Sequence, residues 1–173
     1  FALVEDIHKS LNDISGKQFY SETHRLLKDR EYLIIAPLTK EEDTKFGADF
    51  FINKYQIEIK EPLNLEFSVI VNSDKFVISK NSSIATLNYS KLDFPLVLRK
   101  WKNGDYFYPF GMNKKKKLSD FFIDEKLSII DKENIWLVCS AEKIVWIIGH
   151  RIDNRFRIGK NTKQIFQIAK KEN

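Results

Sequence analysis

Four consecutive lysines, Lys114 to Lys117, stand directly before a segment with the pattern of a helix start. Ser119 is the predicted N-cap, and Asp120 suits the first helical turn, where a negative charge is stabilised. Unpaired backbone N–H groups at a helix start attract anions, phosphates above all. The tract therefore predicts a binding site for a phosphate backbone. A solvated lysine loop is the alternative interpretation, and it stays open at this point.

Further basic residues lie at two predicted turns. Asn103-Gly104 is a tight-turn dipeptide, so the cations beside it are expected near that turn. A second group follows the apolar run 144–148, where Gly149 begins a turn. Together with the lysine tract these groups predict one basic face, made by Arg99, Lys100, Lys102, Lys114, Lys115, Lys116, Lys117, Arg151 and Arg155.

Residue types suited to catalysis are sparse. The histidines, His8, His24 and His150, are scattered and lack the spacing of metal ligands. Cys139 ends an apolar run, which favours a buried, inert thiol over a nucleophile. An ion pair of Asp153 with a neighbouring arginine is expected to be structural. The sequence thus predicts no catalytic residue and no metal site, but it does predict anion binding.

The net charge of +5 is unevenly distributed. Residues 1–93 hold 12 Lys and Arg against 15 Asp and Glu, whereas residues 94–173 hold 17 against 9. A basic half with interleaved aromatic residues is typical of nucleic-acid binding. A single cysteine excludes an internal disulfide framework and suits a reducing cytoplasm. The absence of an initiator Met indicates a fragment, and no apolar run is long enough for a membrane helix.

The hydrophobic pattern predicts elements of both kinds. Two short helices are expected, over residues 2–12 and 21–28, with an exposed loop over 39–49 and a firmer helix over 119–126. Ser128 and Asp131 indicate another helix start. The strand candidates are 31–36, 55–59, 65–71, 76–79, 84–89, 96–101, 106–110, 135–139, 144–148 and 162–169.

These elements predict an α+β fold whose C-terminal domain has an irregular β-sandwich-like core. Residues 72–74 are expected to turn a hairpin between strands 65–71 and 76–79. The expected division is a helical segment leading into the first strand (1–37), a β-rich linker or scaffold (38–93) and a basic domain (94–173).

Long stretches of the basic half are similar to a known family. Arg99–Met112 and Lys116–Asp124, continuing through Ile144–Asp153 and Arg155-Phe156, resemble the C-terminal domain of tRNA(Ile)-lysidine synthetase. Family members usually carry a glycine among the lysines, where this chain has Asn113. A weaker similarity to the segment preceding that domain is carried by Ser15-Gly16-Lys17, Ser21, His24, Asp29-Arg30 and Leu33-Ile34-Ile35.

The resemblance implies a division of labour. In that family an N-terminal domain holds ATP, with magnesium, on a Ser-Gly-Gly-x-Asp-Ser loop. It adenylates the wobble cytidine of the anticodon, and lysine then displaces AMP. This chain lacks that loop, so the fragment alone is expected to be inactive and without a cofactor. It is expected to bind the acceptor-stem end of tRNA(Ile) in the bacterial cytoplasm, through phosphates, 2′-hydroxyls and exposed base edges.

The implied partners are tRNA(Ile) and the chain's own N-terminal catalytic domain, with a homodimer left open and no membrane. Two other readings remain at this point. One is a β-rich protein-interaction or dimerisation module with a merely solvated lysine loop. The other is a stand-alone enzyme that uses an aromatic and carboxylate cleft around Asp105 and Asp120. Salt-sensitive RNA binding distinguishes the first reading from the module, and ATP turnover would favour the enzyme. Whether His24 touches RNA is a further open question.

Overall fold

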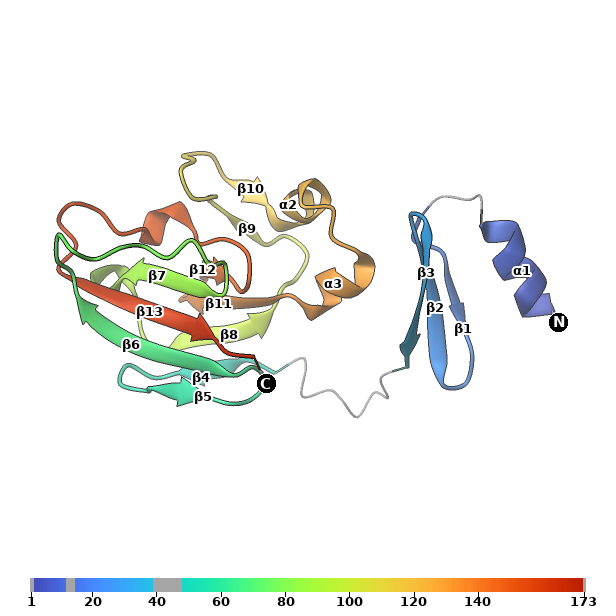
Figure 1. Cartoon of the computed structure of the whole chain (residues 1–173), viewed down its shortest axis with the longest axis horizontal. Coiled ribbons are helices and arrows are strands. Elements are labelled where there is room, and N and C mark those ends of the chain that lie inside the picture. Colours follow the sequence, from blue (N-terminus) through green and yellow to red (C-terminus); the bar gives the residue numbers. More distant parts are fainter. Residues whose placement is uncertain (1, 12–14, 39–47, 173) are drawn as a thin grey trace. The chain divides into compact units, whose positions relative to one another are not determined.

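The computed structural model describes residues 2–11, 15–38 and 48–172 (Figure 1). The chain separates into two units. The first comprises Phe1–Lys45 with Leu127–Glu133, and the second comprises Phe46–Lys126 with Asn134–Asn173. Residues 39–47 of the predicted exposed loop lie outside the described residues. None of the described helices is long and apolar enough to cross a membrane.

The first unit begins with helix α1 (Ala2–Ser10), followed by three short strands. The strands β1 (Gln18–Tyr20), β2 (His24–Asp29) and β3 (Tyr32–Pro37) form an antiparallel sheet in the order β1-β2-β3. The prediction of α1 and of the strand at 31–36 is confirmed. The predicted helix over 21–28 is wrong, because these residues supply the central strand of the sheet.

The reason for that error is local. Leu26 and Leu27 are adjacent apolar residues that fit either a short helix or a strand. Pairing with β3 in a hairpin selects the strand over the helix. Arg30 lies in the turn of this hairpin with a positive φ of 52°. Helix α3 (Ile129–Asn134) starts as predicted: the Ser128 hydroxyl bonds to the Asp131 carboxylate (2.6 Å) and accepts the Asp131 N–H (3.0 Å).

The second unit is built from two antiparallel four-stranded sheets, counted within the described residues. One sheet has the order β12-β11-β8-β4 and the other the order β5-β6-β13-β7. The first consists of β4 (Phe50–Ile52), β8 (Leu96–Lys100), β11 (Trp136–Ser140) and β12 (Lys143–Ile147). The second consists of β5 (Glu58–Ile59), β6 (Leu65–Val71), β7 (Ile84–Asn88) and β13 (Gln164–Lys170).

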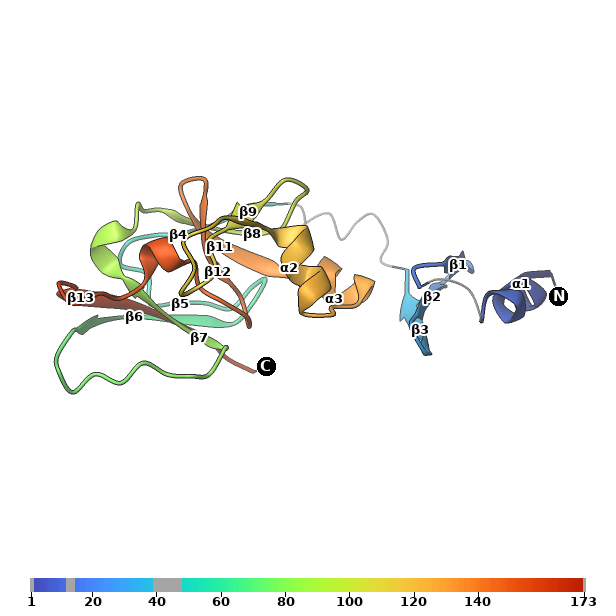
Figure 2. The same cartoon turned by 90° about the horizontal axis from the view of Figure 1, so that it is seen from above.

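The core lies between these two sheets, which Figure 2 shows as layers. Alternate residues of each strand point inward, for example Leu96 and Leu98 from one sheet and Phe166 and Ile168 from the other. The predicted α+β fold with a sandwich-like core is confirmed. Each sheet draws strands from both 38–93 and 94–173, because β4 pairs with β8 and β13 pairs with both β6 and β7.

Two strand predictions need correction. Residues 76–79 form no strand, so the expected hairpin around residues 72–74 is absent among these described residues, and β6 pairs with β13 and β5 instead. The alternating segment 55–59 contributes only Glu58–Ile59 to a sheet. The other predicted strands are found within a few residues of their predicted ranges, whereas β1, β4 and the strand Lys116–Lys117 were not predicted.

A short helix, α2 (Leu118–Asp124), completes the second unit together with the two-stranded ladder of β9 (Tyr106–Phe107) and β10 (Lys116–Lys117). Leu118, Phe121 and Phe122 are buried and form the apolar face of α2. Among the described residues of this unit, the 3-10 helices η2 (Tyr89–Lys91) and η3 (Asn154–Phe156) lie in loops. Figure 1 shows β9, β10 and α2 gathered on one side of the sandwich.

Candidate nucleic-acid interface

The turn after β8 is organised by one carboxylate. Gly104 takes a positive φ of 91°, and the Asp105 N–H closes the turn on the Lys102 carbonyl (3.2 Å). The Asp105 carboxylate accepts both terminal guanidinium nitrogens of Arg99 at 2.8 Å and the Lys102 N–H at 2.9 Å. These hydrogen bonds raise the pKa of Arg99, whose side chain is 13% exposed. Arg99 therefore fastens the turn.

Asp105 also bears on the interpretation of the chain as a stand-alone enzyme. Both of its oxygens are engaged with Arg99 and Lys102, and Asp120 lies exposed on α2. A general acid or base needs access to a reacting group. This arrangement gives Asp105 a structural role in holding the turn.

The lysine tract is partly a strand. Lys116 pairs with Phe107 and Lys117 with Tyr106, so β10 runs antiparallel to β9. The tight turn at Asn103-Gly104 would favour a hairpin between strands 96–101 and 106–110, but β9 pairs with the lysine tract instead of with β8. This pairing holds the end of the tract on the sandwich and fixes where its side chains emerge.

The start of α2 also differs from the prediction. Its N-cap residue is Lys117, and no side chain of a described residue caps it. The Ser119 hydroxyl bonds to the Asp120 carboxylate (3.3 Å), so the predicted Ser119 cap is wrong. The Leu118 N–H donates to the Asp105 carbonyl at 2.9 Å. The Leu118 N–H is therefore not free to bind an anion, although the sequence predicts free N–H groups at this helix start. The positive charge here comes from the lysine side chains.

The lysines of the tract differ in their surroundings. Lys116 forms an ion pair with Asp124 at the end of α2. The Lys115 ammonium lies 5.4 Å from the Tyr106 ring centroid, a cation–π distance. Lys114, Lys115 and Lys117 are exposed, and so is Lys102 on the neighbouring turn. The Leu118–Asp105 hydrogen bond brings that turn beside the end of the tract.

A second carboxylate fixes the other basic turn. Asp153 is fully buried and accepts the Tyr108 N–H at 2.9 Å and the Arg155 N–H at 2.8 Å. It also binds the Arg155 guanidinium through Nε (2.9 Å) and a terminal nitrogen (2.7 Å). The guanidinium carbon lies 4.5 Å from the Tyr108 ring centroid. The Asp153 hydrogen bonds raise the pKa of Arg155, and the expectation that this pair is structural agrees with its geometry.

Sequence reasoning missed Asn154. Its backbone N–H donates to the Tyr108 carbonyl (2.7 Å), while its side chain accepts the Gly111 N–H (3.1 Å) and donates to the Met112 carbonyl (3.0 Å). Asn154 therefore ties η3 to the loop that leads into the lysine tract. The only sequence signal was its place beside Asp153 and Arg155.

The remaining predicted cations are of two kinds. The Arg151 side chain is 51% exposed and lies 3.4 Å from a Glu125 carboxylate oxygen. The Lys100 ammonium packs 4.6 Å from the Trp136 ring centroid. The structure thus divides the predicted set by accessibility. Partly buried are Arg99, Lys100, Lys116 and Arg155; exposed are Lys102, Lys114, Lys115, Lys117 and Arg151, of which Arg151 is also paired with Glu125.

Among the described residues, no group of three or more His, Cys, Asp or Glu side chains could hold a metal ion. Polar groups of the Ser15-Gly16-Lys17 turn form hydrogen bonds within the chain. The Ser15 hydroxyl accepts the Arg30 N–H, and the Gly16 N–H donates to the Lys28 carbonyl (2.8 Å). Cys139 is buried, and burial raises the pKa of its thiol to about 11, which suits an inert side chain.

Comparison with known proteins decides the family. Residues 1–38 match the model of the TilS substrate binding domain, and residues 96–168 match that of the TilS substrate C-terminal domain. The tRNA(Ile)-lysidine synthase of Parabacteroides distasonis is 52% identical over 166 residues, which cover 95% of this chain and 36% of the relative. This chain belongs to the tRNA(Ile)-lysidine synthase family.

Other members of the tRNA(Ile)-lysidine synthase family support the assignment. The enzyme of Bacteroides thetaiotaomicron is 40% identical over 164 residues, 95% of this chain and 35% of that protein. A crystal structure of a TilS C-terminal domain has the same fold, with a TM-score of 0.57 and 15% identity, covering 72% of this chain and 97% of the other. The chain spans about a third of the length of these curated relatives.

Proposed function

We propose that this chain is the RNA-binding part of a tRNA(Ile)-lysidine synthase and binds the acceptor-stem end of tRNA(Ile). The observation that carries the proposal is the attachment of the lysine tract to a rigid frame. Asn154 holds one end of the loop at Gly111 and Met112, and β9 and Asp105 hold the other end at β10 and Leu118. The exposed lysines Lys114 and Lys115 project from the loop, and Lys117 projects from β10. Cations held in a fixed array suit the regularly spaced phosphates of a duplex.

The catalytic step belongs to the rest of the proposed enzyme. ATP with magnesium would serve an N-terminal domain that converts the wobble cytidine to lysidine, and this chain contributes substrate binding only. The anticodon and the acceptor stem lie at opposite ends of a tRNA, so a separate binding domain can position one end while chemistry proceeds at the other. A cytoplasmic location follows from this role, and a homodimer remains an alternative arrangement.

The test is a salt titration of tRNA(Ile) binding by a charge-depleted variant. Each phosphate neutralised by a lysine releases condensed counterions, so log K falls with log salt by about 0.7 to 0.9 per contact. The triple variant Lys114→Ala, Lys115→Ala, Lys117→Ala should bind more weakly and flatten the slope by about two to three units. Folding should persist, because exposed lysines contribute little to stability.

A matched control removes the same charge elsewhere. Lys75, Lys143 and Lys160 are exposed and lie outside the proposed interface, so their replacement by Ala should leave the slope nearly unchanged. Equal losses in the two triple variants would mean that net charge alone attracts RNA. No binding of tRNA by the wild type would overturn the proposal and favour the protein-interaction module.

A further inference from the structure

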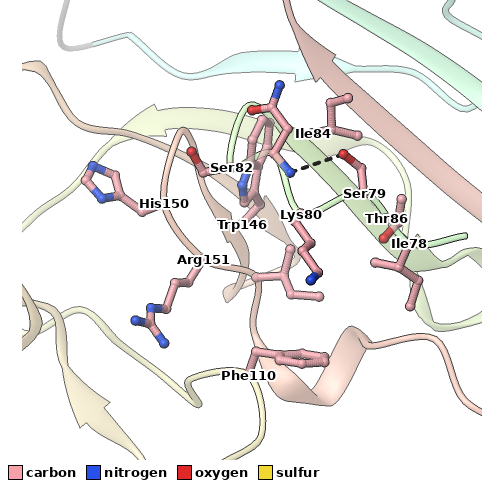
Figure 3. A pocket seen from close by; sticks show the side chains of 12 residues that line it. Ile78, Ser79, Lys80, Ser82, Ile84, Thr86, Phe110, Trp146, His150 and Arg151 are labelled. Carbon is pink, nitrogen blue, oxygen red and sulfur yellow. Dashed lines mark hydrogen bonds between the residues drawn. The ribbon is translucent and has the colours of Figure 1, made fainter.

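The second unit contains a pocket of about 370 Å³ (Figure 3). Of its lining residues, only Arg151 belongs to the predicted basic face. The pocket lies between segment 78–86 and the turn 146–152, with Phe110 at its edge. Trp146 and Thr86 line it from the core and are almost fully buried, whereas Phe110 is 52% exposed. The volume is at the small end of the range for ligand sites, about 300 to 1,000 Å³.

The pocket is lined by basic, hydroxyl-bearing, aliphatic and aromatic side chains. Three basic side chains, Lys80, His150 and Arg151, come from two separate segments. In Figure 3, His150 and Arg151 lie on one side of Trp146 and Lys80 on the other, with Phe110 below them. Among the described residues that line the pocket, none is acidic. An exposed aromatic ring offers a stacking surface to any nucleobase, and neighbouring cations bind its phosphate. A nucleotide carries both groups in one molecule.

The pocket shares a residue with the loop that precedes the lysine tract. Phe110 belongs to the loop that Asn154 fastens through Gly111 and Met112, and this loop leads directly into the lysine tract. Arg151 belongs both to the pocket and to the exposed basic set. A base inside a duplex cannot reach such a pocket, so the occupant must be unpaired.

We propose that this pocket binds one unpaired nucleotide of the RNA, with its base against Phe110 and its phosphate at Lys80 and Arg151. The inference rests on the proposed function and specifies which part of the RNA the chain reads. Duplex phosphates would meet the lysines, and a single-stranded nucleotide beside them would enter the pocket.

The experiment compares two RNA hairpins of identical duplex, one blunt and one with a three-nucleotide single-stranded tail. Fluorescence anisotropy with the 173-residue chain should show at least about fivefold tighter binding of the tailed hairpin, the gain expected for one stacked base. Phe110→Ala should abolish that gain and leave the blunt hairpin unaffected. Phe110→Tyr, which keeps an aromatic face, should retain it.

Phe51→Ala is the matched control, because Phe51 is 58% exposed and does not line the pocket. It should keep the full gain, whereas Lys80→Ala should reduce it. AMP and UMP form a second arm, since a free mononucleotide offers the same groups. Tight binding of a mononucleotide with no gain from the tail would assign the pocket to a small molecule and overturn the proposal.

Three further outcomes are distinguishable. Equal affinity of the wild type for the two hairpins would overturn the pocket proposal while the proposed function stands. Retention of the gain in Phe110→Ala would do the same. No binding of either hairpin by the wild type would overturn both.

Discussion

Arginine and lysine take different parts in this basic half. Arg99 and Arg155 each bind a carboxylate through two nitrogens, Asp105 in one case and Asp153 in the other. The planar fork of guanidinium suits such paired contacts, whereas an ammonium group is a compact charge on a flexible stem. The arginines therefore shape the turns, and the exposed lysines supply charge toward solvent. Because the backbone of the tract is held in place while the lysine side chains are flexible, the ammonium groups can adjust to the position of a phosphate.

The Asp153 pair permits a direct measurement. Asp153→Ala would leave the partly buried Tyr108 N–H and the Arg155 guanidinium without this acceptor, at a cost of about 3 kcal/mol in the free energy of unfolding. Urea unfolding followed by tryptophan fluorescence measures the loss. Glu125→Ala removes the exposed partner of Arg151 and should cost less than about 1 kcal/mol. Equal midpoints for the two variants would contradict the structural role of Asp153.

At the scale of elements, the loop that bears the lysines depends on Asn154. Asn154→Ala removes two hydrogen bonds to the loop backbone but no charge. We expect amide hydrogen exchange over residues 109–117 to accelerate and tRNA affinity to fall several-fold, because a looser array must be ordered on binding. The salt slope should stay the same, since the number of lysines is unchanged.

Asn161→Ala is the control for Asn154→Ala, because Asn161 is exposed on another loop. It should alter neither the exchange nor the affinity. Wild-type exchange rates in Asn154→Ala would show that β9 alone holds the tract.

The elements that sequence predicts well are those whose burial is nearly continuous. β11 and β12 are buried almost throughout, and α2 has three buried residues on one face. The failures are short or depend on partners far along the chain. Residues 24–29 form a strand because residues 32–37 return beside them, and β9 pairs with β10 across an intervening loop. Local preference cannot select between such partners.

The candidate site shows the same limit. The residue types and the two basic turns could be read from the sequence, as could the structural use of Asp153. The accessibility of each cation could not, since it depends on carboxylates such as Asp105 and on rings such as Tyr106 and Trp136. The pocket was also hidden, because segment 78–86 and Phe110 carry no motif and meet only in the folded unit.

At the scale of the whole chain, the excess of positive charge lies in the C-terminal half. Residues 94–173 hold 17 Lys and Arg against 9 Asp and Glu, and the described part of the chain offers no three-residue metal site. We expect the 173-residue chain alone to show no micromolar affinity for ATP in calorimetric titration and to form no lysidine. The same sample should bind tRNA(Ile), which serves as the positive control. Micromolar ATP binding would contradict the assignment of this chain to substrate recognition.

The position of β13 in its sheet has a consequence for biosynthesis. β6 and β7 do not pair with each other; each pairs with β13, which lies between them. The 75 residues between Asn88 and Gln164 must therefore leave the ribosome before this sheet can close. At roughly 5–20 residues per second this takes about 4 to 15 seconds. During that interval the nascent chain carries the apolar residues Phe67 and Leu87 without their eventual cover, so the half-made sandwich is a natural client for chaperones acting at the ribosome exit.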